Sequence, residues 1–188
     1  SGMFPDYFLR FKALTAAGRR VAGRDTVVYD EQLTDWYSVP QHVYARYENY
    51  VGMVVASKRR DGERTGVHQA HPPAYSYVGN PRYGSWGPGG FWQFYGQYAL
   101  MRDLLGGWRV SRNDYDDYRR HRNRRTPYFG PSRGGRPAFG SRGTVTQKTR
   151  PSFYQRYTSR RQSFSNRARS RMTTTRGSSW GSRSFRGK

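Results

Sequence analysis

The sequence predicts a small, aromatic-rich α+β domain followed by a long basic tail that is intrinsically disordered or becomes ordered on a partner. Leu, Val, Phe and Ile together supply 28 of the 188 residues, about 15%. A highly charged chain below roughly 20% usually cannot bury enough apolar surface to fold throughout its length. Aromatic residues partly compensate, because 21 of the 31 Tyr, Phe and Trp residues precede Tyr118 and each buries a large area.

Charge divides the chain at the same place. The formal net charge is +22, yet residues 1–117 hold all 12 acidic residues and only 14 of the 34 Lys and Arg. Residues 118–188 therefore carry 20 basic residues and no carboxylate. We expect a folded unit over 4–110, a charged junction over 111–125, and a low-complexity tail rich in Arg, Gly and Ser over 126–188.

The N-terminal segment has the spacing of a short helix. Pro5 suits the first helical position. Apolar residues then recur at three- and four-residue intervals up to Gly18, at Tyr7, Phe8, Phe11 and Leu14. This pattern predicts an amphipathic helix over 5–17. Residues 26–29, with the sequence TVVY, have the composition of a strand.

Residues 38–68 are compatible with two structures. Helical spacing after Pro40, at Val43, Tyr47, Tyr50 and Val54, indicates a helix to about residue 56. The alternative is a hairpin in which residues 51–57 pair with 64–68 across the Asp61-Gly62 turn. We favour the helix on its spacing and keep the hairpin as the alternative.

A third helix is expected over Phe91–Leu105, after a stretch at 71–90 that proline and glycine divide into turns. Its apolar stripe consists of Phe94, Tyr98, Met101 and Leu105. Gly106-Gly107 supplies the stop signal that commonly follows the last helical residue.

Aromatic residues are densest over Tyr75–Leu105. Such a segment could form a platform on which sugars or bases stack. We favour the structural interpretation, in which these side chains form the core of a small domain that is short of aliphatic residues.

The same segment carries a resemblance. Residues 77–84, YVGNPRYG, followed by FWQFYGQYAL at 91–100, resemble uncharacterised exported bacterial proteins that also end in tails rich in Ser, Arg and Gly. The resemblance covers about 75–188 and brings no activity with it. The resemblance implies a structural role in the bacterial envelope or at the cell surface, and a leader that has been removed. If the resemblance does not hold, the expected compartment is the cytoplasm.

The tail predicts contact with a polyanion. Arginine outnumbers lysine 30 to 4 in the chain, and a guanidinium can grip a phosphate with two hydrogen bonds and also stack on a ring. We expect the polyanion-binding residues to be Arg119, Arg120, Arg122, Arg124, Arg125, Arg133, Arg136 and Arg142. Aromatic residues of the tail would anchor the partner by stacking or by filling pockets, at Phe153, Tyr154 and Tyr157.

The remaining chemistry indicates no enzyme. Cysteine is absent, so disulfides and thiolate sites are excluded. His68 and His71 lie three residues apart, but no third metal ligand is implied. Asp114, Asp116 and Asp117 lie just before five arginines and are interpreted as a charge cluster rather than a cation site.

We therefore expect a non-enzymatic binding or structural protein without a cofactor, a metal or a small-molecule substrate. Its arm would become ordered on acidic protein surfaces in a multi-subunit assembly or, as the alternative, on RNA within a ribonucleoprotein. An anionic membrane surface is less favoured.

Overall fold

The computed structural model describes residues 6–21, 24–58, 62 and 64–175, so residues 176–188 of the predicted tail lie outside the described part. The strands are β1 Tyr7–Leu9, β2 Lys12–Val21, β3 Arg24–Leu33, β4 Tyr37–Val39, β5 Ser57–Lys58, β6 Arg64–Thr65, β7 Gly84–Trp86, β8 Trp92–Phe94, β9 Ser132–Arg133 and β10 Arg136–Pro137. The α-helices are α1 Gln41–Tyr47, α2 Ala99–Leu104, α3 Arg112–Asn123, α4 Thr144–Thr149 and α5 Pro151–Thr175. Short 3₁₀ turns are η1 Val67–Gln69, η2 Tyr75–Tyr77 and η3 Gly96–Tyr98.

This mixture of helices and two-stranded antiparallel sheets confirms the predicted α+β class. None of the described helices is both long enough and apolar enough to cross a membrane.

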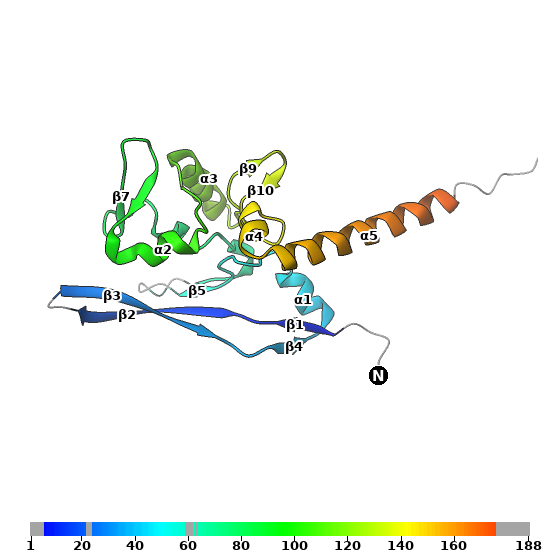
Figure 1. The fold of residues 1–188 in the computed structure, drawn as a ribbon, viewed down its shortest axis with the longest axis horizontal. Coiled ribbons are helices and arrows are strands. Elements are labelled where there is room, and N and C mark those ends of the chain that lie inside the picture. Colours follow the sequence, from blue (N-terminus) through cyan, green and yellow to red (C-terminus); the bar gives the residue numbers. More distant parts are fainter. Residues whose placement is uncertain (1–5, 22–23, 59–61, 63, 176–188) are drawn as a thin grey trace, which may run out of the picture.

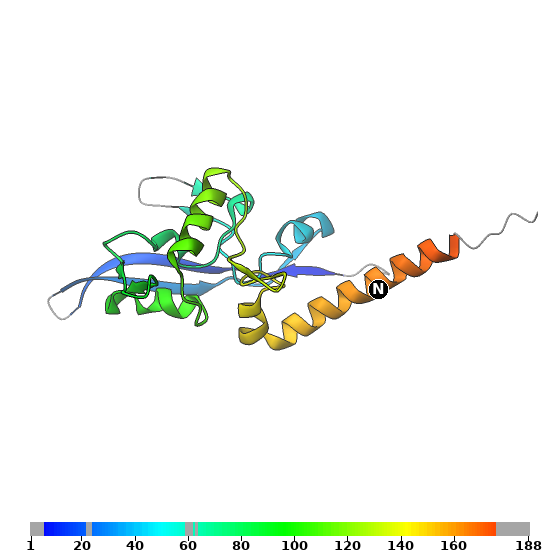
Figure 2. The same cartoon turned by 90° about the horizontal axis from the view of Figure 1, so that it is seen from above.

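The N-terminal residues form a long two-stranded β-arm (residues 7–39), not the helix predicted over 5–17. β2 pairs with β3 over ten residue pairs, from Lys12↔Leu33 to Val21↔Arg24, and β1 continues the arm by pairing with β4. Figures 1 and 2 show the arm lying along one side of the body. The strand predicted at 26–29 is confirmed as part of β3.

Packing against α1 explains why apolar residues recur at helical spacing in a segment that does not form a helix. The ring of Tyr7 lies 4.9 Å from that of Tyr44, and the ring of Phe11 lies 5.5 Å from that of Tyr47. Tyr7 lies in β1 and Phe11 in the link between β1 and β2, and a spacing of four residues places side chains on one side of an extended chain as well as on one face of a helix. The extended structure is favoured because this segment pairs with β3, which contains the β-branched residues Thr26, Val27 and Val28.

Both alternatives for residues 38–68 are right in part. α1 begins after Pro40 as predicted but ends at Tyr47, and Gly52 adopts a left-handed φ of 75° that no continuing helix allows. The hairpin is present in a short form, with Ser57 paired to Thr65 and Lys58 to Arg64.

The third predicted helix is shorter than expected. Residues 92–94 are strand β8, paired with β7, and only Ala99–Leu104 is α-helical. The predicted stop is confirmed, because Gly106 and Gly107 both have left-handed φ values. The residues predicted to form the first half of the helix therefore include strand β8, which pairs with β7 across the turn at 87–90.

The core consists mainly of aromatic side chains, as the interpretation of Tyr75–Leu105 proposed. Tyr75 is fully buried (0% exposed) and contacts the rings of Tyr118, Tyr128 and Phe139 at 5.5–6.1 Å between centroids. Buried residues from the segment also include Val78, Trp92, Tyr98, Met101 and Leu105. Tyr29 joins the core edge and attaches the β-arm to the body.

The predicted start of the tail at residue 126 is wrong for residues 126–149. Tyr128, Phe139 and Val145 belong to the same buried cluster as Tyr75, so the folded unit extends well past 110. Within this stretch, Arg133-Gly134-Gly135-Arg136 is the tip of the β9–β10 hairpin. Both glycines have positive φ, as a two-residue hairpin loop requires.

Among the residues that the structure describes, the contact that holds α5 to the body lies near the start of the helix. The Tyr157 hydroxyl donates a hydrogen bond to Asn49 Oδ1 (2.8 Å), and the Phe153 ring stacks on Tyr157 at 5.8 Å. Both views show the rest of the helix leaving the body (Figures 1 and 2). The sequence had predicted no regular structure over 151–175, because few apolar residues there could support a helix.

Replacing Tyr157 with Phe is expected to loosen α5 without unfolding the body. The variant keeps the ring but loses the bond to Asn49 and the one that Tyr157 accepts from Arg161. Each such bond typically contributes about 0.5–1.5 kcal/mol, so trypsin should cleave after Arg160 and Arg161 about fivefold faster. The control is Tyr95→Phe at an exposed tyrosine. Equal cleavage of the two variants would show that Tyr157 does not hold the helix.

Candidate anion-binding site beside α3

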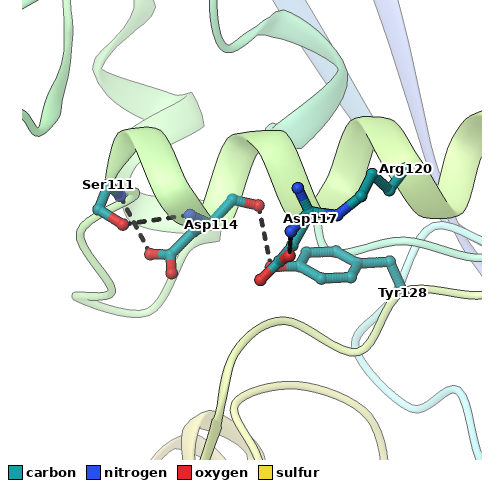
Figure 3. A network of polar contacts seen from close by, with 5 residues as sticks. All are labelled: Ser111, Asp114, Asp117, Arg120 and Tyr128. Carbon is teal, nitrogen blue, oxygen red and sulfur yellow. Dashed lines mark hydrogen bonds and ion pairs between the residues drawn. The ribbon is translucent and has the colours of Figure 1, made fainter.

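α3 carries its charges in the order that its dipole favours. Its first turn is fixed by a capping box, in which the Asp114 N–H donates to Ser111 Oγ (3.2 Å) and the Ser111 N–H donates to Asp114 Oδ2 (3.0 Å). Asp117 forms an ion pair with Arg120 one turn later (Figure 3). Acidic side chains near the N-terminus and basic ones in the last turn both stabilise a helix. Asp117 thus pairs with a downstream arginine as the predicted charge cluster requires, whereas Asp114 caps the helix.

The helix ends in a motif that normally uses glycine. The Thr126 N–H donates to the His121 carbonyl and the Arg125 N–H donates to the Arg122 carbonyl, each at 3.0 Å. These are the two bonds of a Schellman motif. Arg125 occupies its left-handed position with a φ of 55°, where a side chain costs about 1 kcal/mol relative to glycine. The sequence therefore keeps an arginine at a position where glycine would be more stable.

The chain that follows α3 folds back against the helix. The Tyr128 hydroxyl donates to the Asp114 main-chain carbonyl at 3.0 Å (Figure 3). Burial raises the pKa of Tyr128, with the nearby Asp114 as a second cause, and burial likewise raises the pKa of Tyr75. Both hydroxyls therefore stay neutral at physiological pH, and this buried layer supports the inner side of α3.

A pocket of about 400 Å³, called here the α3 pocket, opens between α3 and the turns η1 and η2. Its cationic lining residues are Arg119, Arg122 and Arg125, and its aromatic ones are Tyr75, Tyr115 and Tyr118. Gln69, Ser76 and Asn123 add polar groups. Among the described residues that line it, none is acidic. The pocket therefore offers hydrogen-bond donors and positive charge beside aromatic rings.

The arginines predicted on α3 divide into two groups. Arg119, Arg122 and Arg125 are spaced by three residues and line the α3 pocket. Arg120 is paired with Asp117, and Arg124 is exposed at the C-cap. The structure thus brings together three of the five arginines at one place, and this division was not visible in the sequence.

The predicted arginines beyond α3 are not gathered at the pocket. Arg133 and Arg136 face each other across the β9–β10 hairpin, and the Arg133 guanidinium lies 5.2 Å from the Trp108 ring. Arg142 is exposed in the turn before α4. These residues remain predicted polyanion contacts, but Arg133 already has an aromatic partner within the chain.

Contacts between arginine side chains and aromatic rings recur within this structure. The structure contains six among its described residues: Arg10–Trp36, Arg109–Phe91, Arg112–Trp86, Arg119–Tyr115, Arg133–Trp108 and Arg161–Tyr157. A chain of this length usually has about two or three significant ones. Part of the arginine and aromatic content that indicated RNA binding therefore serves the fold.

The predicted stacking anchors have different surroundings from those expected. Tyr157 is buried (8% exposed) against the body and cannot stack on a partner while α5 is docked. Phe153 and Tyr154 are half-buried beside it. Phe164 is 75% exposed and lies on the same helical face as Tyr157, since the two are seven residues apart. It is the better-placed aromatic residue for an external contact.

Sequence reasoning missed the other residues of the pocket. Tyr115, Gln69 and Asn123 line it, although none belongs to a recognisable motif. The available signal was the spacing of Tyr115, Arg119 and Arg122 by four and then three residues, which places them on one face of a helix. No helix is predicted over these residues from the sequence, so the signal was missed.

No protein-family model matches the chain, and neither curated proteins nor solved structures give a significant match. The described residues include no group of three or more His, Asp and Glu side chains that could hold a metal ion. His68 is exposed, whereas His71 is buried and stacks on Tyr118 at 5.5 Å.

Proposed function

We propose that this chain is a non-enzymatic binding protein, a subunit of a larger assembly, whose C-terminal arm becomes stably ordered on a polyanionic or acidic partner. The geometry of α5 carries the proposal. The helix spans 25 residues with six arginines and no acidic residue. Every described side chain from 159 to 170 is exposed.

Such a helix is weak on its own. Helices in proteins are stabilised mainly by packing of one face, and among the α5 side chains whose burial the structure describes, Tyr157 alone is buried. Like charges four residues apart, such as Arg156 and Arg160, each destabilise a helix by about 0.2–0.5 kcal/mol. A partner that neutralises these charges would therefore strengthen the helix while it binds.

Two partner classes fit this chemistry. An acidic protein surface needs only complementary charge and shape. An RNA partner, which would make the protein a ribonucleoprotein component, is favoured by one observation, namely the combination of arginine and tyrosine in the α3 pocket. A structural role in the bacterial envelope is supported only by the resemblance of residues 75–188 to exported proteins.

We expect α5 to gain helicity when a polyanion is added to the full chain. Circular dichroism at 222 nm would follow the titration, with polyuridylic acid and polyglutamate as the probes. For polyuridylic acid, log affinity should fall linearly with log salt at about −0.7 per phosphate neutralised. A triple variant, Arg156→Gln, Arg160→Gln and Arg167→Gln, should make that slope shallower by about 2.

The matched control replaces the same three arginines with lysine. Because this variant keeps the charge, its salt slope should equal that of the wild type. If neither probe binds at low ionic strength, or if the glutamine triple variant binds with an unchanged slope, the arm is not the polyanion-binding element and the proposal fails.

A further inference from the structure

The α3 pocket is a formed concavity, unlike the exposed arm. Its volume of about 400 Å³ falls within the roughly 300–1,000 Å³ of small-ligand sites. The capping box, the Schellman motif and the Tyr128 hydrogen bond fix the helix that carries most of its lining. A ligand would therefore meet side chains that are already positioned.

Charge limits what the pocket can hold. Arg119 and Arg125 form no ion pair among the described residues, and no acidic side chain lines the pocket beside them. Two guanidinium groups beside one polar concavity favour an anion, and a phosphate, like a carboxylate, can accept two hydrogen bonds from the planar fork of arginine. The pocket therefore favours a ligand that carries a negatively charged group of that geometry.

The remaining lining is suited to a ring with polar edges. Tyr115 is half-buried at the pocket and Tyr118 is buried behind it. The amides of Gln69 and Asn123 can each donate and accept hydrogen bonds. Unpaired bases combine an aromatic face with such donor and acceptor edges, and proteins recognise them by aromatic contact and amide hydrogen bonds.

We propose that the α3 pocket binds one nucleotide unit, with its phosphate at Arg119 and Arg125 and its base among the tyrosines and amides. The unit comes either from a free mononucleotide or from an unpaired nucleotide of a single strand. The strand version rests on the proposed polyanion-binding function, because α5 would then hold the neighbouring phosphates.

Arg125 provides the sharpest variant. Arg125→Gly removes a charge from the pocket but places the preferred residue at the left-handed position, so the melting temperature should stay equal or rise. Loss of binding in this variant cannot come from unfolding. The second pocket variant is Arg119→Gln with Arg125→Gln, and its control is Arg46→Gln with Arg82→Gln, which removes the same charge from exposed sites that lie outside the pocket and outside the predicted polyanion-binding set.

The experiment measures binding of uridine monophosphate, a twelve-residue uridine oligonucleotide and inorganic phosphate to the full-length variants at fixed salt. We expect the nucleotide probes to lose about tenfold in affinity in Arg125→Gly and more in the pocket double variant, and less than about threefold in the control. Binding of the monophosphate identifies a free nucleotide as the source, and binding of the oligonucleotide alone identifies the strand.

Three results would overturn the inference. Equal losses in the pocket and control double variants would mean that the oligonucleotide contacts a diffuse cationic surface, which leaves the proposed function intact. Inorganic phosphate that binds as tightly as the monophosphate would remove the base from the site. No binding of any phosphate probe, while polyglutamate still binds, would assign an acidic protein as the partner.

Discussion

Replacing Phe139 with alanine is expected to destabilise the whole body strongly, although Phe139 lies in a stretch of Gly, Ser and Arg. Its side chain is 2% exposed, and its ring lies 6.1 Å from that of Tyr75 and 6.2 Å from that of Trp108. It also packs so closely on Gly130 that a Cβ there would lie 2.7 Å from the ring. Truncating a buried Phe typically costs about 3–5 kcal/mol, a large part of the roughly 5–15 kcal/mol that stabilises a domain.

Urea denaturation followed by near-ultraviolet circular dichroism would measure this loss, because the aromatic core gives the signal. Phe164→Ala is the matched control, since it removes the same side chain from an exposed position of the same basic half. Its free energy of unfolding should stay within about 0.5 kcal/mol of the wild type. If Phe139→Ala behaves like Phe164→Ala, residues 126–149 are not part of the folded unit.

The two phenylalanines show what the sequence could and could not predict. Composition correctly assigned the core to the aromatic segment over 75–105, because nothing else in the chain could bury as much area. It placed the end of the domain too early, since a low density of apolar residues was read as an absence of core. Four buried side chains, Tyr128, Ala138, Phe139 and Val145, join residues 126–149 to the core.

Glycine explains why so few anchors suffice. Gly130 and Gly140 adopt left-handed φ values that turn the chain back on itself, and the main chain of Phe139 pairs with Phe129 at 2.9 Å. Main-chain hydrogen bonds of this kind cannot be read from composition. Glycine content predicted flexibility here, whereas its effect in the structure is to permit tight packing.

The sequence predicted where the arginine-rich segment lies, but not which of its arginines face a common pocket. Counting charges located the arginine-rich segment 119–125 correctly, and the structure retains it as a cationic surface. Which arginines face the pocket depends on the three-residue periodicity of α3 and on the turn at Arg125. Both depend on the capping box at Ser111 and on tertiary contacts of Tyr128, which a charge count does not include.

Acid is expected to destabilise the fold through His71, and the loss begins at a higher pH than the titration of carboxylates. His71 is 6% exposed, and its main chain forms an antiparallel bridge with Val54. Burial, with Arg122 as a second cause, lowers the pKa of His71 from 6.5 to about 4. The unfolded chain therefore binds a proton between pH 6.5 and 4 that the folded chain does not bind, so stability is full above about 6.5 and falls as the pH decreases.

The size of this effect can be tested directly. The difference in the pKa of His71 corresponds to a loss of about 3 kcal/mol by pH 4. Urea denaturation at intervals between pH 7.5 and 4.5 would show the decline in the wild type.

His71→Phe keeps a ring beside Tyr118 but cannot titrate, so its stability should stay nearly constant over that range. His68→Gln, at an exposed histidine, should decline like the wild type. A decline of equal size in His71→Phe would assign the acid sensitivity to other groups and would show that His71 is protonated in the folded chain as readily as in the unfolded one.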